Sequence, residues 1–328
     1  MKEKVLITGA NGFLGFHLIE SALAKNLEVY AAVRKSSDIK HLEHLPIQYV
    51  YLDYNNVEKL ASGLREGAYD YIIHAAGLTK AKSLSEYNQV NVDITVNLSK
   101  AIQESVTGFK KLVFLSSLAA VGPLNNSREL ITEDTKPKPV TQYGKSKLMA
   151  EQALESFRLP LTILRPTAVY GPREKDIFII LKTIRRGIDA YIGKIQQQLS
   201  FVHARDVADL AISSLFMNAN GIYNISDGQN YSRYDLADIT KSILKKKAFR
   251  IHLPVYIGRM MASVSQTTYS LMNKVPVLNK EKLNEFLANN WVCDISKAKK
   301  ELEFKPGYNL QKGLEQTIAW YKEHKWLR

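Results

Sequence analysis

Three glycines near the beginning of the chain, Gly9, Gly12 and Gly15, restrict the possible folds more than any other feature of the sequence. They follow the apolar run Lys4–Thr8, which is typical of a buried strand, and they precede His17–Lys25, which has helical periodicity. Small residues between a strand and a helix let the backbone approach a pyrophosphate, whose charge lies at the helix N-terminus. The spacing G-x-x-G-x-x-G therefore predicts a dinucleotide-binding turn, with contacts from Gly9, Asn11, Gly12, Phe13, Leu14 and Gly15.

Strands and helices alternate after this turn. The apolar runs predict further strands at Glu28–Val33, Gln48–Asp53, Tyr69–Gly77 and Phe109–Ser117, with a helix at Asn91–Ile102. Such alternation implies right-handed crossovers and an α/β fold of the Rossmann type, with a doubly wound parallel sheet. Ligands of such a sheet bind beyond the carboxyl ends of its strands.

Several residues at these strand ends are candidate cofactor contacts. One is a carboxylate that could accept a hydrogen bond from the adenine amine, and a run of small residues would let a cofactor pass close to the backbone. The expected contacts are Asp53, His74, Ala75, Ala76, Gly77 and Pro166.

Two basic residues, Arg34 and Lys35, follow the strand predicted at Glu28–Val33. A carboxylate that binds the ribose would be expected at this place in a protein that uses NAD(H). Arg34 and Lys35 would instead attract a 2′-phosphate, and the sequence therefore favours NADP(H) over NAD(H). The alternative is a pair of solvated charges at a strand end.

Tyr143 and Lys147 lie four positions apart at the start of a predicted helix, so their side chains share one face. A lysine ammonium beside a phenol favours the phenolate and lowers its pKa from the ordinary value of about 10. We therefore expect Tyr143 to act as a general acid or base that moves a proton on and off a carbinol oxygen. The pair alone is not specific, because this spacing also occurs by chance on exposed helices.

The chain leaves the sheet after a further strand at Leu161–Arg165, because proline and glycine interrupt the next residues. Strand patterns return near residue 200 and at Gly221–Ser226. We predict a dinucleotide-binding domain of residues 1–170 and 199–227. Residues 171–198 and 228–328 would form a smaller, interleaved substrate-binding lobe.

The amino-acid composition is typical of a globular protein. The chain has 328 residues, 45% of them hydrophobic, and a formal net charge of +13. Its basic residues are scattered and match no nucleic-acid-binding motif, so we expect no nucleic-acid partner. The single cysteine, Cys293, excludes an internal disulfide, and we expect it to be a packed small hydrophobe. With no leader and no apolar run long enough to span a bilayer, we predict a cytoplasmic protein without stable membrane insertion.

These residues in this order resemble the extended short-chain dehydrogenase/reductase family, also described as NAD-dependent epimerase/dehydratases. The resemblance covers nearly the whole chain. Its motifs are Thr8-Gly-x-x-Gly-Phe-x-Gly15, Ser116-Ser117, Tyr143-x-x-x-Lys147, Arg165-Pro-x-x-Val-Tyr-Gly-Pro-Arg173 and Phe201-Val-His-x-x-Asp-Val-Ala208.

The resemblance implies a role for each residue of the expected catalytic site. Tyr143 would donate or accept the proton, and Lys147 would lower its pKa and hold the nicotinamide ribose. Ser117 would bond the substrate oxygen, and Asn91 would help to order a proton relay. Ile94 departs from the family pattern, in which a glycine often stands there. The resemblance also implies a homodimer that pairs the helices beginning near Asn91 and Tyr143.

Three functions are compatible with this set of residues. The leading hypothesis is an NAD(P)-dependent oxidoreductase that interconverts a secondary alcohol and a carbonyl on a non-nucleotide small molecule. A nucleotide-sugar 4-epimerase is the alternative, and a non-catalytic dinucleotide sensor is a third. A sugar dehydratase is disfavoured, since no carboxylate follows Ser117. The run Gln198–His203 lacks the arginine with which many epimerases bind a diphosphate, although Arg173, Lys182, Arg185 or Arg205 could supply that charge.

Two further stretches bear on the substrate. Residues 116–123 and 291–302 resemble the branch of the family that contains 3β-hydroxysteroid dehydrogenases and dihydroflavonol reductases. Residues 253–278 are apolar and contain methionines, which is compatible with a core helix of the small lobe. They are also compatible with an adaptable lid over a lipophilic substrate, in contact with a membrane surface.

Overall fold

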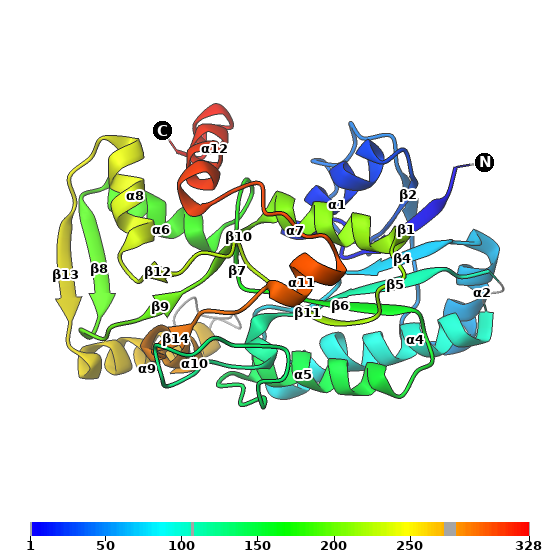
Figure 1. The fold of residues 1–328 in the computed structure, drawn as a ribbon, viewed down its shortest axis with the longest axis horizontal. Coiled ribbons are helices and arrows are strands. Elements are labelled where there is room, and N and C mark those ends of the chain that lie inside the picture. The colour runs from blue at the N-terminus through cyan, green and yellow to red at the C-terminus, as the bar shows by residue number, and fades with distance from the viewer. Residues whose placement is uncertain (1, 106–107, 272–279, 328) are drawn as a thin grey trace.

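The computed structural model describes residues 2–105, 108–271 and 280–327. Within them, seven parallel strands form one sheet in the order β11-β6-β5-β4-β1-β2-β3 (Figure 1). The strands are β1 (Lys4–Thr8), β2 (Glu28–Ala32), β3 (Gln48–Val50), β4 (Tyr71–His74), β5 (Lys111–Leu115), β6 (Leu161–Pro166) and β11 (Gly221–Ile225). The predicted doubly wound parallel sheet is confirmed.

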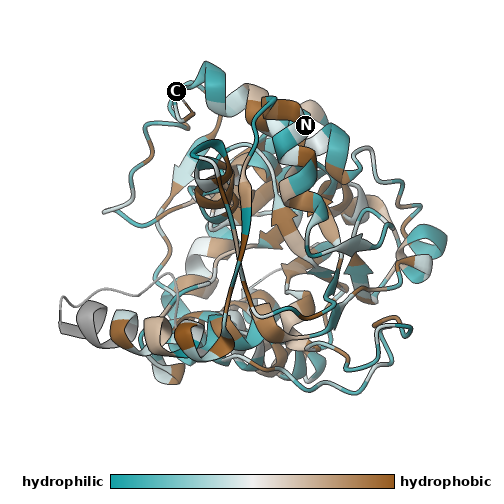
Figure 2. Cartoon of the chain, turned by 90° about the vertical axis from the view of Figure 1, so that its left-hand side faces the viewer, coloured by the Kyte–Doolittle hydropathy of each residue, from teal (hydrophilic) through white to brown (hydrophobic). Residues whose placement is uncertain are grey.

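Part of the remaining chain builds the opposite end of the molecule, on the left of Figure 1. Figure 2 looks at this end, where the parallel pair β8–β13 lies toward the viewer. The strands outside the large sheet are β7 (Ala168–Tyr170), β8 (Ile188–Ile192), β9 (Gln198–Leu199), β10 (Phe201–His203), β12 (Tyr231–Ser232), β13 (Phe249–Leu253) and β14 (Asn290–Trp291). The sequence did not predict most of these strands, because the majority have two or three residues and show no periodicity.

Helices cover both faces of the large sheet. They are α1 (Phe13–Ala24), α2 (Val57–Gly67), α3 (Leu84–Asn88), α4 (Ile94–Ser105), α5 (Gln142–Glu155) and α7 (Ala204–Ser213), with short 3-10 turns at Leu118–Ala120 (η2) and Ser214–Phe216 (η3). The smaller end contains α6 (Asp176–Arg185), α8 (Asp235–Leu244), α9 (Val255–Leu271), α10 (Lys280–Leu287) and α12 (Leu310–Glu323). Helix α11 (Ser296–Glu301) packs instead against β11 of the large sheet.

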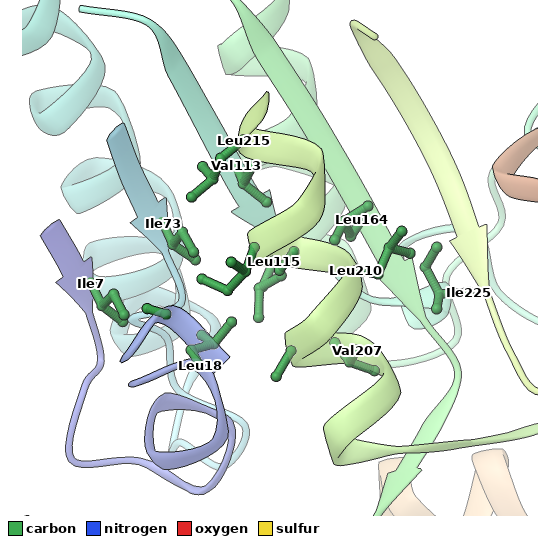
Figure 3. Packing of buried hydrophobic residues seen from close by; sticks show 14 of the residues in the cluster. Ile7, Leu18, Ile73, Val113, Leu115, Leu164, Val207, Leu210, Leu215 and Ile225 are labelled. Atoms are coloured by element: carbon green, nitrogen blue, oxygen red, sulfur yellow. The ribbon is translucent and has the colours of Figure 1, made fainter. Parts of the chain in front are cut away.

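Side chains alternate between the two faces of the sheet and fill two cores. On one face, Ile7, Ile73 and Val113 pack with residues of α1 and α7 (Figure 3). On the other face, the neighbouring strand residues Leu6 and Ile72 pack with residues of α2, α4 and α5. Burial on both faces explains the continuous apolar runs by which these strands were recognised in the sequence.

The C-terminal segment contributes to both ends of the molecule. Cys293 is buried in the core beside α1 and α7, as expected for a packed small hydrophobe, and burial raises the pKa of its thiol to about 12. Leu314 and Tyr321 of α12 belong instead to a third core in the smaller end. The division into two lobes at residues 170, 198 and 227 stays a prediction.

One local expectation is confirmed with a different type of helical turn at its start, and another was wrong. The predicted helix at Asn91–Ile102 begins as a π-helical turn, Gln89–Asp93, and becomes α-helical only at Ile94. The strand predicted to reach Asp53 ends at Val50, because β3 lies at the edge of the sheet and pairs with β2 only as far as Ala32. No helix among the described residues is long and apolar enough to cross a bilayer.

Candidate functional site

The glycine-rich turn connects β1 to α1 at the carboxyl edge of the sheet. Gly9 has a φ of +67°, and a Cβ at this position would lie 2.7 Å from the carbonyl oxygen of Ala75. Both the backbone conformation and the close approach of the end of β4 therefore require glycine. The amide of Gly12 closes the turn by donating to the carbonyl of Gly9 at 2.9 Å.

The N-terminus of α1 has the features of an anion-binding site. Gly12 is the N-cap residue and provides no side-chain acceptor for the first helical turn, which contains Phe13, Leu14 and Gly15. The free amides of such a turn, together with the helix dipole, favour a phosphate. The turn and the small residues Ala75–Gly77 beside it therefore fit a dinucleotide.

A chain of buried hydrogen bonds fixes the end of β4 against its neighbours. The Ala76 amide donates to Thr8 Oγ1 at 3.0 Å, and His74 lies between Thr8 (Nδ1, 2.7 Å) and Thr95 (Nε2, 2.9 Å). Thr95 Oγ1 donates to the Asn91 carbonyl, so His74 Nε2 must donate to Thr95 and Nδ1 must accept from Thr8. Burial lowers the pKa of His74 to about 3, and the ring is neutral. His74 thus positions the strand end and has no ring nitrogen left for a cofactor.

Asn91 connects the chain after β4 to helix α5. Its Oδ1 accepts from the amide of Leu78 at 2.7 Å, and its Nδ2 donates to the carbonyl of Leu78 and to Ser146 Oγ at 2.8 Å. The side chain is buried, and its bonding capacity is mostly used inside the protein. Its contacts are those of a residue that orders the site.

The residues predicted for the adenosine end of the cofactor are exposed. Arg34 and Lys35 lie on a turn in which the amide of Arg34 donates to Ser37 Oγ, and the ion pairs of the described residues include neither side chain. Asp53 is also exposed and accepts from the amide of Asn55 at 3.2 Å. Pro166, by contrast, is buried at the end of β6.

Tyr143 and Ser117 meet because α5 packs closely on the 3-10 turn η2. A Cβ at Gly144 would lie 2.3 Å from the carbonyl oxygen of Ala119, so only glycine allows this approach. Ser117 Oγ accepts from the Ala119 amide at 3.2 Å and lies near enough to the phenol of Tyr143 to lower its pKa. A serine at the end of β5 and a tyrosine in the first turn of α5 thereby form one polar pair.

Lys147 lies one turn further along α5, on the same helix face as Tyr143. Its ammonium donates to the carbonyl of Leu115 at 2.7 Å and lies 4.5 Å from the centroid of the Phe114 ring. A Cβ on Gly77 would lie 3.6 Å from Lys147 Nζ. Lys147 therefore spans the carboxyl ends of β4 and β5, where the glycine-rich turn also lies.

The expected effect of Lys147 on Tyr143 is absent from this structure, and that part of the prediction was wrong. Desolvation raises the pKa of Tyr143 to about 12, and the neighbouring Ser117 hydroxyl opposes this only in part. Burial also lowers the pKa of Lys147 to about 8, partly offset by Glu151. The ammonium is directed at the Leu115 carbonyl, Lys147 is buried and Tyr143 is half-buried, so desolvation outweighs any effect of the lysine charge on the phenol.

A buried ion pair beneath the site was not found from the sequence. Glu151, one turn after Lys147, accepts from Arg165 through Nη2 at 2.6 Å and through Nε at 3.0 Å. Ser116 Oγ donates to the same carboxylate. Glu151 is 1% exposed and Arg165 is 3% exposed. The i, i+4 spacing of Lys147 and Glu151 was a signal that could have indicated this cluster.

The smaller end of the molecule also reaches the site, through α10. Glu281 Oε2 accepts from the backbone amide of Gln142 at 3.1 Å, at the start of α5. The charge of Glu285 contributes to the raised pKa of Tyr143, and the ring of Tyr87 lies 6.2 Å from that of Tyr143. The sequence could not indicate α10, because more than 130 residues separate it from Tyr143.

The four candidate diphosphate ligands lie in different surroundings. The guanidinium of Arg173 is 3.9 Å from the centroid of the Phe16 ring on α1, so it lies beside the glycine-rich turn. Burial lowers its pKa, but it remains a cation. The side chains of the other three candidates, Lys182, Arg185 and Arg205, are exposed.

Comparison with known proteins gives a consistent result. The model of the NAD dependent epimerase/dehydratase family matches residues 5–226. A UDP-glucose 4-epimerase of Vibrio cholerae is 28% identical over 337 residues, covering 97% of this chain and 95% of that protein. A ceramide reductase of Caulobacter vibrioides is 25% identical, covering 98% and 96%. The crystal structure of a UDP-glucose 4-epimerase from Thermotoga maritima has the same fold, with a TM-score of 0.79, 20% identity and coverage of 98% and 99%.

Proposed function

The chain belongs to the NAD dependent epimerase/dehydratase family, and from this premise we propose that it interconverts a secondary alcohol and a carbonyl. The observation that carries the proposal is the Ser117–Tyr143 pair at the end of β5, with Lys147 one helical turn away and the glycine-rich turn on the same edge of the sheet. This arrangement supports proton transfer next to a bound dinucleotide.

The side chains of this site would divide the work as follows. A bound nicotinamide dinucleotide supplies or accepts the hydride. Tyr143, with its raised pKa, retains its proton at neutral pH and can donate it to a carbonyl oxygen. Ser117 orients that oxygen by a hydrogen bond. Lys147 holds the ribose next to the nicotinamide, and Asn91 keeps the chain after β4 in place.

We propose NADP(H) as the preferred cofactor. Arg34 and Lys35 follow β2, where the ribose of the adenosine would lie, and both side chains are exposed. Two cations at this place favour a 2′-phosphate. Asp53, at the end of the next strand, would accept from the adenine amine.

For the substrate we propose a non-nucleotide, lipophilic alcohol or ketone. The similarity to a ceramide reductase supports this assignment, as does the absence of arginine from the run Gln198–His203. A nucleotide-sugar 4-epimerase is the second candidate, favoured by the similarity to the Vibrio enzyme. Arg173, beside the glycine-rich turn, could serve either cofactor or substrate phosphates.

Substitution of Tyr143 by phenylalanine tests the reaction. We expect Tyr143→Phe to bind NADPH as the wild type does, while kcat falls by about 10² to 10⁴. Tyr87→Phe is the matched control, because it removes the phenol of a ring next to that of Tyr143 and should retain most activity. Turnover that survives in Tyr143→Phe would show that another group transfers the proton.

Calorimetry separates the two substrate classes. Titration of the wild type with NADPH, NADH, UDP-sugars and a long-chain ketone should give binding of NADPH and of the ketone. Tight retention of NAD(H) with clear binding of a UDP-sugar would overturn the reductase assignment and establish the epimerase. Neither result alters the expectation for Tyr143→Phe, since both reactions require the same proton transfer.

A further inference from the structure

The end of the molecule that is remote from the large sheet exposes apolar side chains on three elements. Both views place β8, β13 and the beginning of α9 at this end (Figures 1 and 2). Its exposed apolar residues are Ile188, Phe249, Ile251, Tyr256, Met260 and Met261, which we call the lobe-end surface.

The β8–β13 pair carries its apolar side chains on the outer face. Phe249 pairs with Ile188, and Ile251 lies two residues further on, so all three share one face. Phe249 is 83% exposed. The opposite face is polar and packs inward, since Arg250 donates to Asp189 at 3.0 Å. This orientation is the reverse of that of an ordinary half-buried sheet.

Helix α9 shows the same inversion. Its small residues face the protein, because Ala262 is fully buried and a Cβ on Gly258 would lie 2.7 Å from Ile192. Its large residues face outward, with Tyr256 71% and Met260 60% exposed. Exposed apolar side chains gathered on one surface mark a site of interaction.

Positive charge lies next to these side chains. Lys246 and Lys247 line the same hollow as Phe249. Both are exposed, and the ion pairs of the described residues do not include them, whereas Lys241 in the same hollow pairs with Asp189 and Asp238. Apolar side chains flanked by unpaired lysines are complementary to an anionic lipid surface. A second copy of this chain fits less well, because its own lobe-end surface carries the same charge.

We propose that the lobe-end surface docks onto the surface of an anionic lipid bilayer without crossing it. Phe249, Tyr256 and Met260 enter the interfacial region, and Lys246 and Lys247 contact the anionic head groups. This inference does not depend on the reaction proposed above, since it concerns a surface formed by β8, β13 and α9 rather than by the sheet edge.

Flotation of the full chain with lipid vesicles tests the proposal. We expect the protein to float with phosphatidylcholine vesicles that contain phosphatidylglycerol and not with phosphatidylcholine alone. Lys246→Gln/Lys247→Gln should lower the partition coefficient about fivefold for each charge removed. Tyr256→Ser/Met260→Ser should lower it about tenfold.

The controls carry equivalent changes elsewhere on the surface. Lys25→Gln/Lys300→Gln removes two exposed lysines, and Phe216→Ser removes an exposed aromatic residue next to β5. Both should float as the wild type does, and all variants should keep the wild-type thermal transition. Absence of flotation, equal partition onto both vesicle types, or full binding by both lobe-end variants would overturn the proposal. So would a concentration-dependent dimer, in place of flotation, that Tyr256→Ser/Met260→Ser abolishes, because it would assign the surface to a second copy of the chain.

Discussion

The carboxylate of Glu281 accepts a hydrogen bond from the backbone amide of Gln142 at 3.1 Å, although 139 residues separate them in the chain. The amide of Gln142 is one of the first in α5 and has no partner within the helix. Thr141 satisfies a second such amide, that of Gly144, at 3.0 Å. Two residues therefore satisfy amides at the start of the helix that carries Tyr143. One is the preceding residue Thr141, and the other is Glu281, which is distant in the sequence.

Removal of this contact should weaken the protein by a small, measurable amount. We expect Glu281→Ala to lower the free energy of unfolding by about 1 kcal/mol, because a helix N-terminus loses both an acceptor and a favourable charge. Urea denaturation would measure the change. Glu104→Ala, which removes an exposed glutamate from α4, should have little effect. Equal free energies for wild type and Glu281→Ala would mean that the contact does not contribute to stability.

The lowered pKa of Lys147 gives a pH-dependent prediction. Its folded pKa is about 8, below the ordinary value near 10.5, so the folded state binds fewer protons than the unfolded state between these values. Burial of the ammonium thus destabilises the fold fully below pH 8, and this penalty disappears as the pH rises toward 10.5. The free energy of unfolding of Lys147→Met, minus that of the wild type, should therefore be about 2 kcal/mol lower at pH 9.5 than at pH 7.

Comparison of two pH values removes the other effects of that substitution. Loss of the packing of the lysine side chain changes stability equally at both pH values, and the remaining lysines are common to both proteins. Denaturant unfolding at pH 7 and pH 9.5 gives the difference directly. The same difference at both pH values would contradict a lowered pKa for Lys147 in the free protein.

The choice of cofactor should depend on the turn after β2. We expect Arg34→Ala/Lys35→Ala to raise the Kd for NADPH by about tenfold or more, since each charge-assisted bond to a phosphate contributes on the order of 1.5–3 kcal/mol. The Kd for NADH should change little. Lys25→Ala, an exposed lysine at the end of α1, is the control. A parallel loss of affinity for both cofactors would place the 2′-phosphate elsewhere.

Replacement of only one member of the Glu151–Arg165 ion pair should strongly destabilise the protein. Glu151→Gln leaves a buried guanidinium without its carboxylate, and we expect the free energy of unfolding to fall by about 3–5 kcal/mol. The double variant Glu151→Leu/Arg165→Met should recover much of this loss, because no charge then remains buried. Urea denaturation of the wild type, Glu151→Leu, Arg165→Met and the double variant measures the coupling. Additive losses in the double variant would argue against a direct interaction.

Much of the fold could be read from local patterns. The run Lys4–Thr8, the glycine-rich turn and the helix after it were recognisable because their periodicity and their small residues depend on near neighbours in the chain. The same holds for the face shared by Tyr143 and Lys147, which follows from helix geometry alone. The short strands of the smaller end lacked such a signal, since pairing with distant segments defines them.

What surrounds the shared face was decided only by the tertiary structure. The close packing of Gly144 on Ala119 brings Tyr143 to Ser117, and the folding of α10 over α5 brings Glu281 to Gln142. The pKa of Tyr143, which the sequence predicted to be lowered, is raised in the structure for the same reason. A charge four residues away is a local property of the sequence, whereas desolvation depends on everything that packs around the phenol, and here desolvation is the larger effect.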